Sequence, residues 1–200
     1  MRSMSVEVSR DILGWKEIDW KKLTELNVKK LQRLMRDHGV DALIVQSLDN
    51  FQYITGYRVP SNINLMYYLH RQGAILPAEE DQPIMLAGAA DIFDAKHFHW
   101  IKDVRSMPIQ IELWPKIVKS ALNDHGIAGT VALDSRMQYG LAEGIKRELG
   151  SKYEFVNGSE LENRYTRYCL KPWPGALLQR RGCLFLACIP PYSACLLPVP

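Results

Sequence analysis

The first 168 residues of this 200-residue chain contain no cysteine, and the last 38 contain no acidic residue. The four cysteines are Cys169, Cys183, Cys188 and Cys195, and their spacing matches no common zinc-ligand pattern. A cytosolic compartment keeps thiols reduced, so we expect neither a disulfide framework nor a cysteine zinc site.

Long uninterrupted apolar runs are also missing. The first fifteen residues hold no apolar segment of the kind that a signal peptide needs. The apolar stretch 183–199 is broken by Pro190, Pro191 and Pro198, which makes it unsuitable as a membrane helix. We therefore expect a cytoplasmic protein with no membrane partner.

Charge and proline divide the chain near residue 163. Residues 1–162 hold 20 Lys and Arg against 22 Asp and Glu, a net charge of −2, whereas residues 163–200 hold 5 basic groups and no acidic group, a net charge of +5. The nearly neutral body has no basic face that would indicate a nucleic-acid partner. We divide the chain into an N-terminal extension (1–22), one domain (23–162) and an aberrant Pro/Cys-rich tail (163–200), which we expect to pack poorly because proline interrupts helices and ladders.

Helical and strand patterns alternate along the domain. Val28, Leu31 and Met35 form one apolar stripe of a helix over 23–38, and the apolar run 42–45 is typical of a strand covered on both faces, which we place at 42–46. Further strands are expected at 73–76, 84–86, 104–109, 130–133 and 153–156, and further helices at 89–98, 113–125 and 137–149. This order predicts an α/β fold in which a mixed β-sheet is flanked by helices.

Connecting segments carry their own signals. The acidic segment AEEDQP predicts a hairpin turn between strands 73–76 and 84–86, and NFQYITGY at 50–57 predicts an aromatic turn. Asp134 and Ser135 are suited to cap the helix over 137–149. The helix over 113–125 carries two apolar rows, which are Leu113, Ile117, Ala121 and Trp114, Val118, Leu122.

One short motif occurs twice, as DHGV at 37–40 and DHGI at 124–127, each time before a predicted strand. Such segments arise independently wherever a helix ends and a strand begins, because histidine is favourable at the negative helix end. A duplicated half of the fold is the alternative, and the sequence leaves both open.

Three groups could carry chemistry, and each has a structural alternative. If their segment is extended, His97 and His99 lie on one side of it, as metal ligands do, but we favour a surface pair beside Trp100 because no third ligand lies nearby in the sequence. The carboxylates at 79–81 fit a solvated hairpin turn, and Ser135 fits a helix cap rather than a nucleophile.

The segment 30–57, KLQRLMRDHGVDALIVQSLDNFQYITGY, resembles the N-terminal domain of the creatinase/prolidase family. In that family a basic helix, a glycine, an xDAxxV strand and an NxxYxTG turn follow in this order. The GTVALDS segment at 129–135 and the later order of elements also fit, so the resemblance covers roughly residues 23–171. The family includes Xaa-Pro aminopeptidases, Xaa-Pro dipeptidases and creatinase.

The resemblance implies that catalysis belongs to a second domain that this chain lacks. In the family that domain binds a pair of divalent metals through two Asp, one His and two Glu, so we expect no metal, no cofactor and no catalytic residue in this chain. Residues 167–171 resemble the start of the segment that opens the catalytic domain, and then the similarity stops. The tail is either a truncated or frame-shifted end or a genuine docking segment.

The resemblance also implies three candidate substrate-binding residues, Arg71, Tyr53 and Tyr57. In related dimers the N-terminal domain reaches toward the partner subunit's active site, and Arg71 occupies the position of an arginine that lies near substrate there. A guanidinium binds a carboxylate through two parallel hydrogen bonds. The alternatives are a solvated arginine at a strand end and two packing aromatics.

Two functions follow. The first is a non-catalytic N-terminal domain of a creatinase or Xaa-Pro aminopeptidase-like metallohydrolase, with a role in dimerisation and in completing a substrate site. The second is a stand-alone interaction module that docks on a full-length relative. The expected partner is accordingly a second copy of the chain or a full-length relative.

Overall fold

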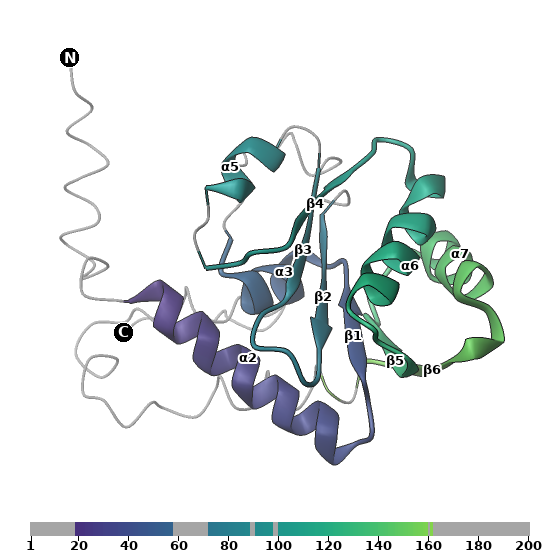
Figure 1. Ribbon diagram of the computed structural model, residues 1–200, viewed down its shortest axis with the longest axis horizontal. Coiled ribbons are helices and arrows are strands. Elements are labelled where there is room, and N and C mark those ends of the chain that lie inside the picture. The colour runs from purple at the N-terminus through teal and green to yellow at the C-terminus, as the bar shows by residue number, and fades with distance from the viewer. Residues whose placement is uncertain (1–18, 58–71, 89–90, 98–99, 160, 162–200) are drawn as a thin grey trace, which may run out of the picture. The chain divides into compact units, whose positions relative to one another are not determined.

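The structure is a computed structural model, which describes residues 19–57, 72–88, 91–97, 100–159 and 161. The candidate Arg71, the second histidine of the 97–99 pair and the tail from residue 163 lie outside the described residues. The domain is built around one β-sheet with helices packed on it (Figure 1).

The sheet has six strands in the order β4-β3-β2-β1-β5-β6. Their bounds are β1 (Ala42–Val45), β2 (Gly73–Pro77), β3 (Ile84–Gly88), β4 (Val104–Met107), β5 (Gly129–Leu133) and β6 (Tyr153–Asn157). Strand β2 runs antiparallel to both β1 and β3, whereas the β3–β4, β1–β5 and β5–β6 pairs are parallel. The predicted mixed sheet and the predicted hairpin at β2–β3 are confirmed.

The helices are α2 (Trp20–Asp37), α3 (Leu48–Thr55), α5 (Ile92–Lys96), α6 (Trp114–Asp124) and α7 (Tyr139–Leu149), with 3₁₀ turns at Ile111–Leu113 and Gly150–Lys152. Helices α6 and α7 pack beside each other on one face of the sheet (Figure 1). Helices α2 and α3 contact each other and β2. Every residue of β1, β2 and β3 is buried. Because strand side chains alternate between the two faces, both faces of the sheet are covered at these strands.

The predicted apolar stripes lie in the core. Val28, Leu31 and Met35 of α2 are at most 1% exposed. Ile145 and Leu149 of α7 are buried in the hydrophobic cluster that also contains the buried residues of α6. The two rows of α6 differ from the prediction at one end, because Leu113 belongs to the preceding 3₁₀ turn and is exposed. The other row, from Trp114 onward, is buried.

Two local predictions were wrong. The segment expected to form an aromatic turn at 50–57 forms most of helix α3, which ends at Gly56 in the left-handed conformation (φ +69°). The pair Asp134 and Ser135 does not cap α7, because this helix begins at Tyr139 with Gln138 in the N-cap position. Asp134 instead serves the neighbouring helix α3, as described below.

The repeated DHG motif closes both helices in the same way. Gly39 and Gly126 have φ of +64° and +63°. The next residue of each copy donates its backbone N–H to a helical carbonyl five residues back, Val40 to Met35 and Ile127 to Leu122. This is the Schellman arrangement, which accounts for the recurrence by local capping and leaves a duplication untested.

Candidate functional site

The family-like segment after β1 is held together by packing and hydrogen bonds. The hydroxyl of Thr55 donates to the Phe51 carbonyl at 2.8 Å, and the indole N–H of Trp100 donates to the Thr55 carbonyl at 2.9 Å. Tyr57 is 3% exposed and meets the Phe51 ring edge-on, with 6.3 Å between ring centroids. These contacts fix the path of the chain between α3 and the residues that follow.

Asp134 connects this segment to the loop after β5. Its carboxylate accepts the backbone N–H groups of Gln46 (3.0 Å) and Ser47 (2.7 Å), where α3 begins, and that of Arg136 (2.9 Å) in its own loop. It also accepts the side-chain amide of Asn50 at 3.2 Å. A carboxylate at the N-terminus of a helix satisfies free N–H groups and favours the helix dipole.

The connection is reciprocal, because Gln46 accepts the backbone N–H of Gln138, the N-cap of α7, at 2.9 Å. Burial by itself raises the pKa of the Asp134 carboxyl, but hydrogen bonds from Ser47, Arg136 and Gln46 outweigh burial, so the pKa lies below its usual value. The charged form is therefore the one that the fold stabilises. The two loops at the ends of β1 and β5 behave as one unit.

The three predicted substrate-binding residues are only partly located. Tyr53 is half-buried on α3, and Tyr57 lies buried just beyond the same helix. Arg71 itself is outside the described residues, but the next residue, Gln72, is 1% exposed and donates to Asp91 at 2.7 Å. The three positions therefore remain candidates, with Tyr57 in a packing environment.

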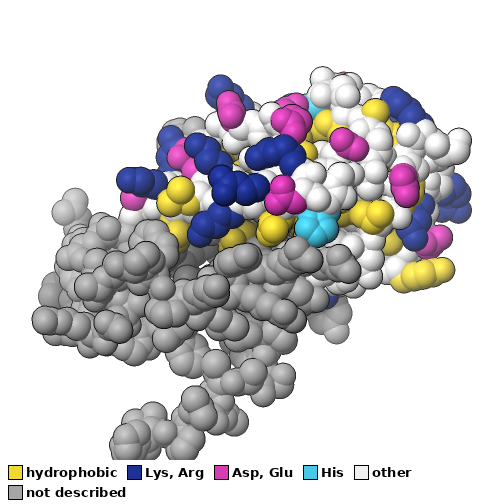
Figure 2. Space-filling model, turned by 90° about the horizontal axis from the view of Figure 1, so that it is seen from below, with side chains coloured by type: hydrophobic (Ala, Val, Ile, Leu, Met, Phe, Trp, Pro, Cys, Tyr) yellow, Lys and Arg dark blue, Asp and Glu magenta, His cyan; other side chains and the backbone are white. Residues whose placement is uncertain are grey.

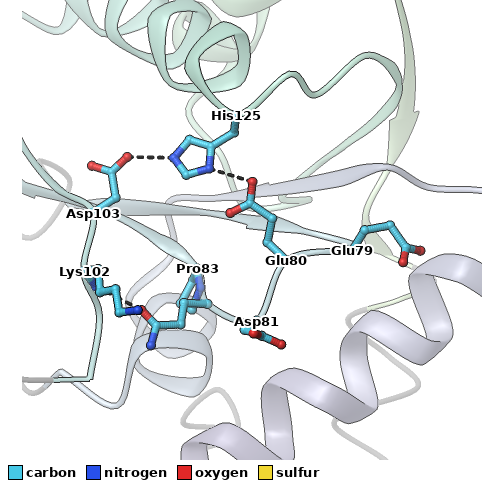
Figure 3. A pocket seen from close by; sticks show the side chains of 8 residues that line it. Glu79, Glu80, Asp81, Pro83, Lys102, Asp103 and His125 are labelled. Carbon is cyan, nitrogen blue, oxygen red and sulfur yellow. Dashed lines mark hydrogen bonds and ion pairs between the residues drawn. The ribbon is translucent and has the colours of Figure 1, made fainter.

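A pocket of about 450 Å³ lies beside the β2–β3 turn. The turn forms one side, the start of β4 forms another, and the end of α6 closes the third (Figure 3). Its lining residues are Glu79, Glu80, Asp81, Gln82, Pro83, Lys102, Asp103 and His125. Four of these are carboxylates, so the pocket is predominantly acidic.

His125 lies between two of the carboxylates (Figure 3). Its Nδ1 is 2.6 Å from a Glu80 carboxylate oxygen, and its Nε2 is 2.9 Å from an Asp103 oxygen. Arg105 binds Asp103 with both Nε and a terminal nitrogen and donates to Asp124 at 2.8 Å. One network thus joins the β2–β3 turn, β4 and the end of α6.

The network shifts three pKa values. Burial lowers the pKa of His125, but hydrogen bonds to Asp103 and Glu80 outweigh burial and raise it above its usual value. Burial raises the pKa of Asp103, and its bonds to Arg105 and His125 bring it below the usual value. The hydrogen bonds that Arg105 donates to Asp103 raise the pKa of the Arg105 guanidinium above its usual value. Protonated His125 between ionised carboxylates is therefore the favoured state below its raised pKa.

The backbone of the same turn is held from its other side by α2. The side-chain amide of Gln32 donates to the carbonyls of Pro77 (2.9 Å) and Glu80, and Arg36 donates to the Ala78 carbonyl at 2.7 Å. The exposed Glu79 and Asp81 match the predicted solvated turn. The pairing of Glu80 with His125 was missed, because the two residues lie 45 positions apart in the sequence.

The arrangement offers no obvious reaction centre. Both ring nitrogens of His125 already face carboxylates, so neither is available as a general base. His97 lies beside Phe93, whose carbonyl is 2.7 Å from Nδ1. Within the described ranges, no group of three or more His, Cys, Asp or Glu side chains is arranged to hold a metal ion, so these residues do not fit the metal pair that the resemblance implies.

In the part of the chain that the structure describes, no helix is long and apolar enough to cross a membrane.

The chain has clear structural relatives. An Xaa-Pro aminopeptidase from Streptococcus pyogenes superposes with a TM-score of 0.50 at 14% identity, covering 70% of this chain and 98% of that one. The N-terminal domain of the cytoplasmic peptidase PepQ from Mycobacterium tuberculosis gives 0.52 at 15% identity, over 69% and 97%. No curated protein sequence matches the chain.

Longer relatives show how much is matched. An Xaa-Pro dipeptidase from Bacillus anthracis gives a TM-score of 0.53 at 9% identity, covering 72% of this chain but 36% of that one. The chain therefore spans about a third of the length of that dipeptidase. A family model for the creatinase/prolidase N-terminal domain matches residues 27–165, which is more than half of the chain. This chain belongs to the creatinase/prolidase N-terminal domain family.

Proposed function

We propose that this chain is a non-catalytic N-terminal domain of a creatinase or Xaa-Pro aminopeptidase-like metallohydrolase that assists dimerisation and completes a substrate site. The family match over residues 27–165 is the observation that carries the proposal. In this role Arg71 and Tyr53 would reach toward substrate while the buried Tyr57 holds the segment that carries Tyr53. A cytoplasmic location and a second copy of the chain as partner belong to the same proposal.

The absence of catalysis is the first prediction. Hydrolysis of an amide at neutral pH needs an activated water, which the family's peptidases obtain from a metal pair. The described residues hold no side-chain group that fits such a pair. The purified chain incubated with Mn²⁺, Co²⁺ or Zn²⁺ and Xaa-Pro dipeptides should release no amino acid above the blank.

A full-length Xaa-Pro peptidase from the same organism, assayed under the same conditions, is the positive control. Sedimentation velocity on the same sample tests dimerisation, which should appear as a concentration-dependent shift from monomer to dimer. Chelator-sensitive cleavage by the isolated chain would contradict the non-catalytic role, and a monomer at all concentrations would contradict the dimerisation role.

A second candidate function, an interaction module that docks on a full-length relative, is favoured by the outer face of α2. This helix carries six basic and two acidic residues, and its basic side chains gather on one face (Figure 2), which the nearly neutral charge of the body did not predict. Lys29, Lys30 and Arg33 are all exposed, and Arg33 lies four residues after Lys29 and three after Lys30. Such a face fits an acidic protein surface through charge complementarity.

Charge reversal on α2 tests this docking. The double variant Lys30→Glu/Arg33→Glu should bind the full-length relative at least about tenfold more weakly, because two attractive pairs become repulsive. The matched control is Lys116→Glu/Arg147→Glu, which makes the same charge change at exposed positions of α6 and α7. Titration calorimetry at two salt concentrations is the measurement, and equal affinities of the two variants would argue against docking through α2.

A further inference from the structure

The two carboxylate contacts of His125 depend on the protonation state of its imidazole ring. A neutral imidazole has one N–H and one lone pair, so it donates to one carboxylate and presents its lone pair to the other. Nδ1 faces Glu80 at 2.6 Å and Nε2 faces Asp103 at 2.9 Å, so both distances are short enough for donated hydrogen bonds. Both bonds can form together only when His125 is the doubly protonated imidazolium.

The two carboxylates depend on His125 to different degrees. Asp103 is also bound by Arg105 through three contacts of 2.7–3.1 Å, and its backbone adjoins β4. Among the described residues, the only ion pair of the Glu80 carboxylate is with His125. Glu80 also sits on a turn, where a side chain is free to move without disturbing the sheet. When the imidazolium loses one proton, the bond to Glu80 is therefore the one that breaks.

We propose that protonated His125 is a pH-sensitive latch that fastens the β2–β3 turn to the end of α6 and releases it on deprotonation. In the closed state the turn is held on both sides, by His125 through the Glu80 side chain and by Gln32 and Arg36 of α2 through backbone carbonyls. In the open state the contacts with α2 and the hydrogen bond from the Lys102 backbone N–H to the Gln82 side chain remain, whereas the link between the turn and the end of α6 is lost.

The charged groups around His125 are mostly carboxylates, which favour its protonated form, and two cations oppose them. The turn contributes Glu79, Glu80 and Asp81, and α6 contributes Asp124, which binds Arg105. The start of β4 contributes Lys102 as well as Asp103 and Arg105. The carboxylates outnumber the cations, so the surroundings retain the proton on His125 beyond its usual titration range. Because the pKa is raised, the latch is closed at lower pH and opens as pH rises through the folded-state pKa.

The repeated DHG motif supplies a matched control within the same chain. His38 occupies the equivalent helix end, but its Nδ1 faces the Leu34 carbonyl at 2.8 Å rather than a carboxylate. Both histidines follow an aspartate and precede a glycine in the left-handed conformation. A general effect of helix-end histidines would therefore appear at both positions, whereas the latch would appear only at His125.

Nuclear magnetic resonance of the ¹⁵N-labelled chain tests the latch. The ring nitrogen shifts of His125 should titrate above the usual histidine value of 6.5. Across that titration the heteronuclear NOE of the amides at 79–82 should fall, reporting increased motion of the turn. In His125→Gln and in Glu80→Gln these NOE values should no longer follow pH, whereas His38→Gln should retain the wild-type response.

Two results would overturn the latch. One is a titration midpoint of His125 at or below the usual histidine value of 6.5. The other is a turn whose NOE values stay constant through the His125 titration, or change equally in the His125→Gln variant. Glu80→Gln leaves the helix end of α6 untouched, so it keeps the test decisive if the histidine variant unfolds.

Discussion

Replacing Asp134 by alanine is expected to lower the free energy of unfolding by about 3–5 kcal/mol, because several donors lose their acceptor at once. Asp134 is 4% exposed and accepts three backbone N–H groups and the Asn50 amide. Each buried donor left without a partner costs about 1–3 kcal/mol, partly relieved by water that enters the space. Stability typically totals about 5–15 kcal/mol, so the expected loss is a large fraction of it. Urea denaturation followed by circular dichroism is the measurement.

Two further variants, Asp134→Asn and Ser135→Ala, show whether the charge of the Asp134 side chain or only its size stabilises the fold. Asp134→Asn keeps the size of the side chain but turns an N–H₂ group toward donors, so it should lose a large part of the same stability. Ser135→Ala, one residue further on at an exposed position, should change stability by less than about 1 kcal/mol. Equal stabilities of Asp134→Ala and Ser135→Ala would show that the carboxylate does not hold the two loops together.

The contribution of Asp134 to the free energy of unfolding is expected to depend on pH. The folded-state pKa of Asp134 lies below its usual value, so its contribution is complete above the unfolded-state pKa, near 3.8. As pH falls below that value toward the folded-state pKa, the contribution is progressively lost. Wild type should therefore lose more stability than Asp134→Asn between pH 5 and pH 3.

Local patterns predicted the elements whose own residues decide their structure. The apolar stripe of α2 repeats at the helical period, and β1 to β3 are continuous apolar runs, so each followed from its own segment. Helix α3 did not, because Asn50, Tyr53, Ile54 and Thr55 favour turns or strands and Gly56 signals a stop. The carboxylate that binds the backbone N–H of its N-cap Ser47 belongs to Asp134, 87 residues away, so no local pattern reveals this contact.

The hydrogen-bond network at the pocket could not be predicted from local patterns either, because its members are far apart in the sequence. Glu80 and Asp103 lie 45 and 22 residues before His125, and each is unremarkable in its own segment. Only the strand order, which places β4 next to β3 and α6 over the sheet, brings them together. The sequence contains one usable sign, because the repeated DHG motif places His125 at the end of a predicted helix.

Replacing Gly56 by alanine is the other change with a large expected effect, about 2–5 kcal/mol of lost stability. Gly56 ends α3 with φ of +69°, a conformation that costs an L-residue about 1–2 kcal/mol. A Cβ at this position would lie 2.5 Å from Thr24 Oγ1 of α2, well inside van der Waals contact. Thr24 is 5% exposed and β-branched, so it has little room to rotate away. An alanine at position 56 must therefore push α2 and α3 apart.

Gly39 provides the control that divides these two costs. It has φ of +64°, but a Cβ there would meet nothing within 4 Å. Gly39→Ala should therefore lose only the conformational part, about 1–2 kcal/mol, and the difference between the two variants measures the contact with α2. In the double variant Gly56→Ala/Thr24→Ala, the removed hydroxyl and methyl should make the combined loss smaller than the sum of the two single losses. Additive losses, or equal losses at Gly56 and Gly39, would show that close approach of α2 and α3 is not what requires glycine at position 56.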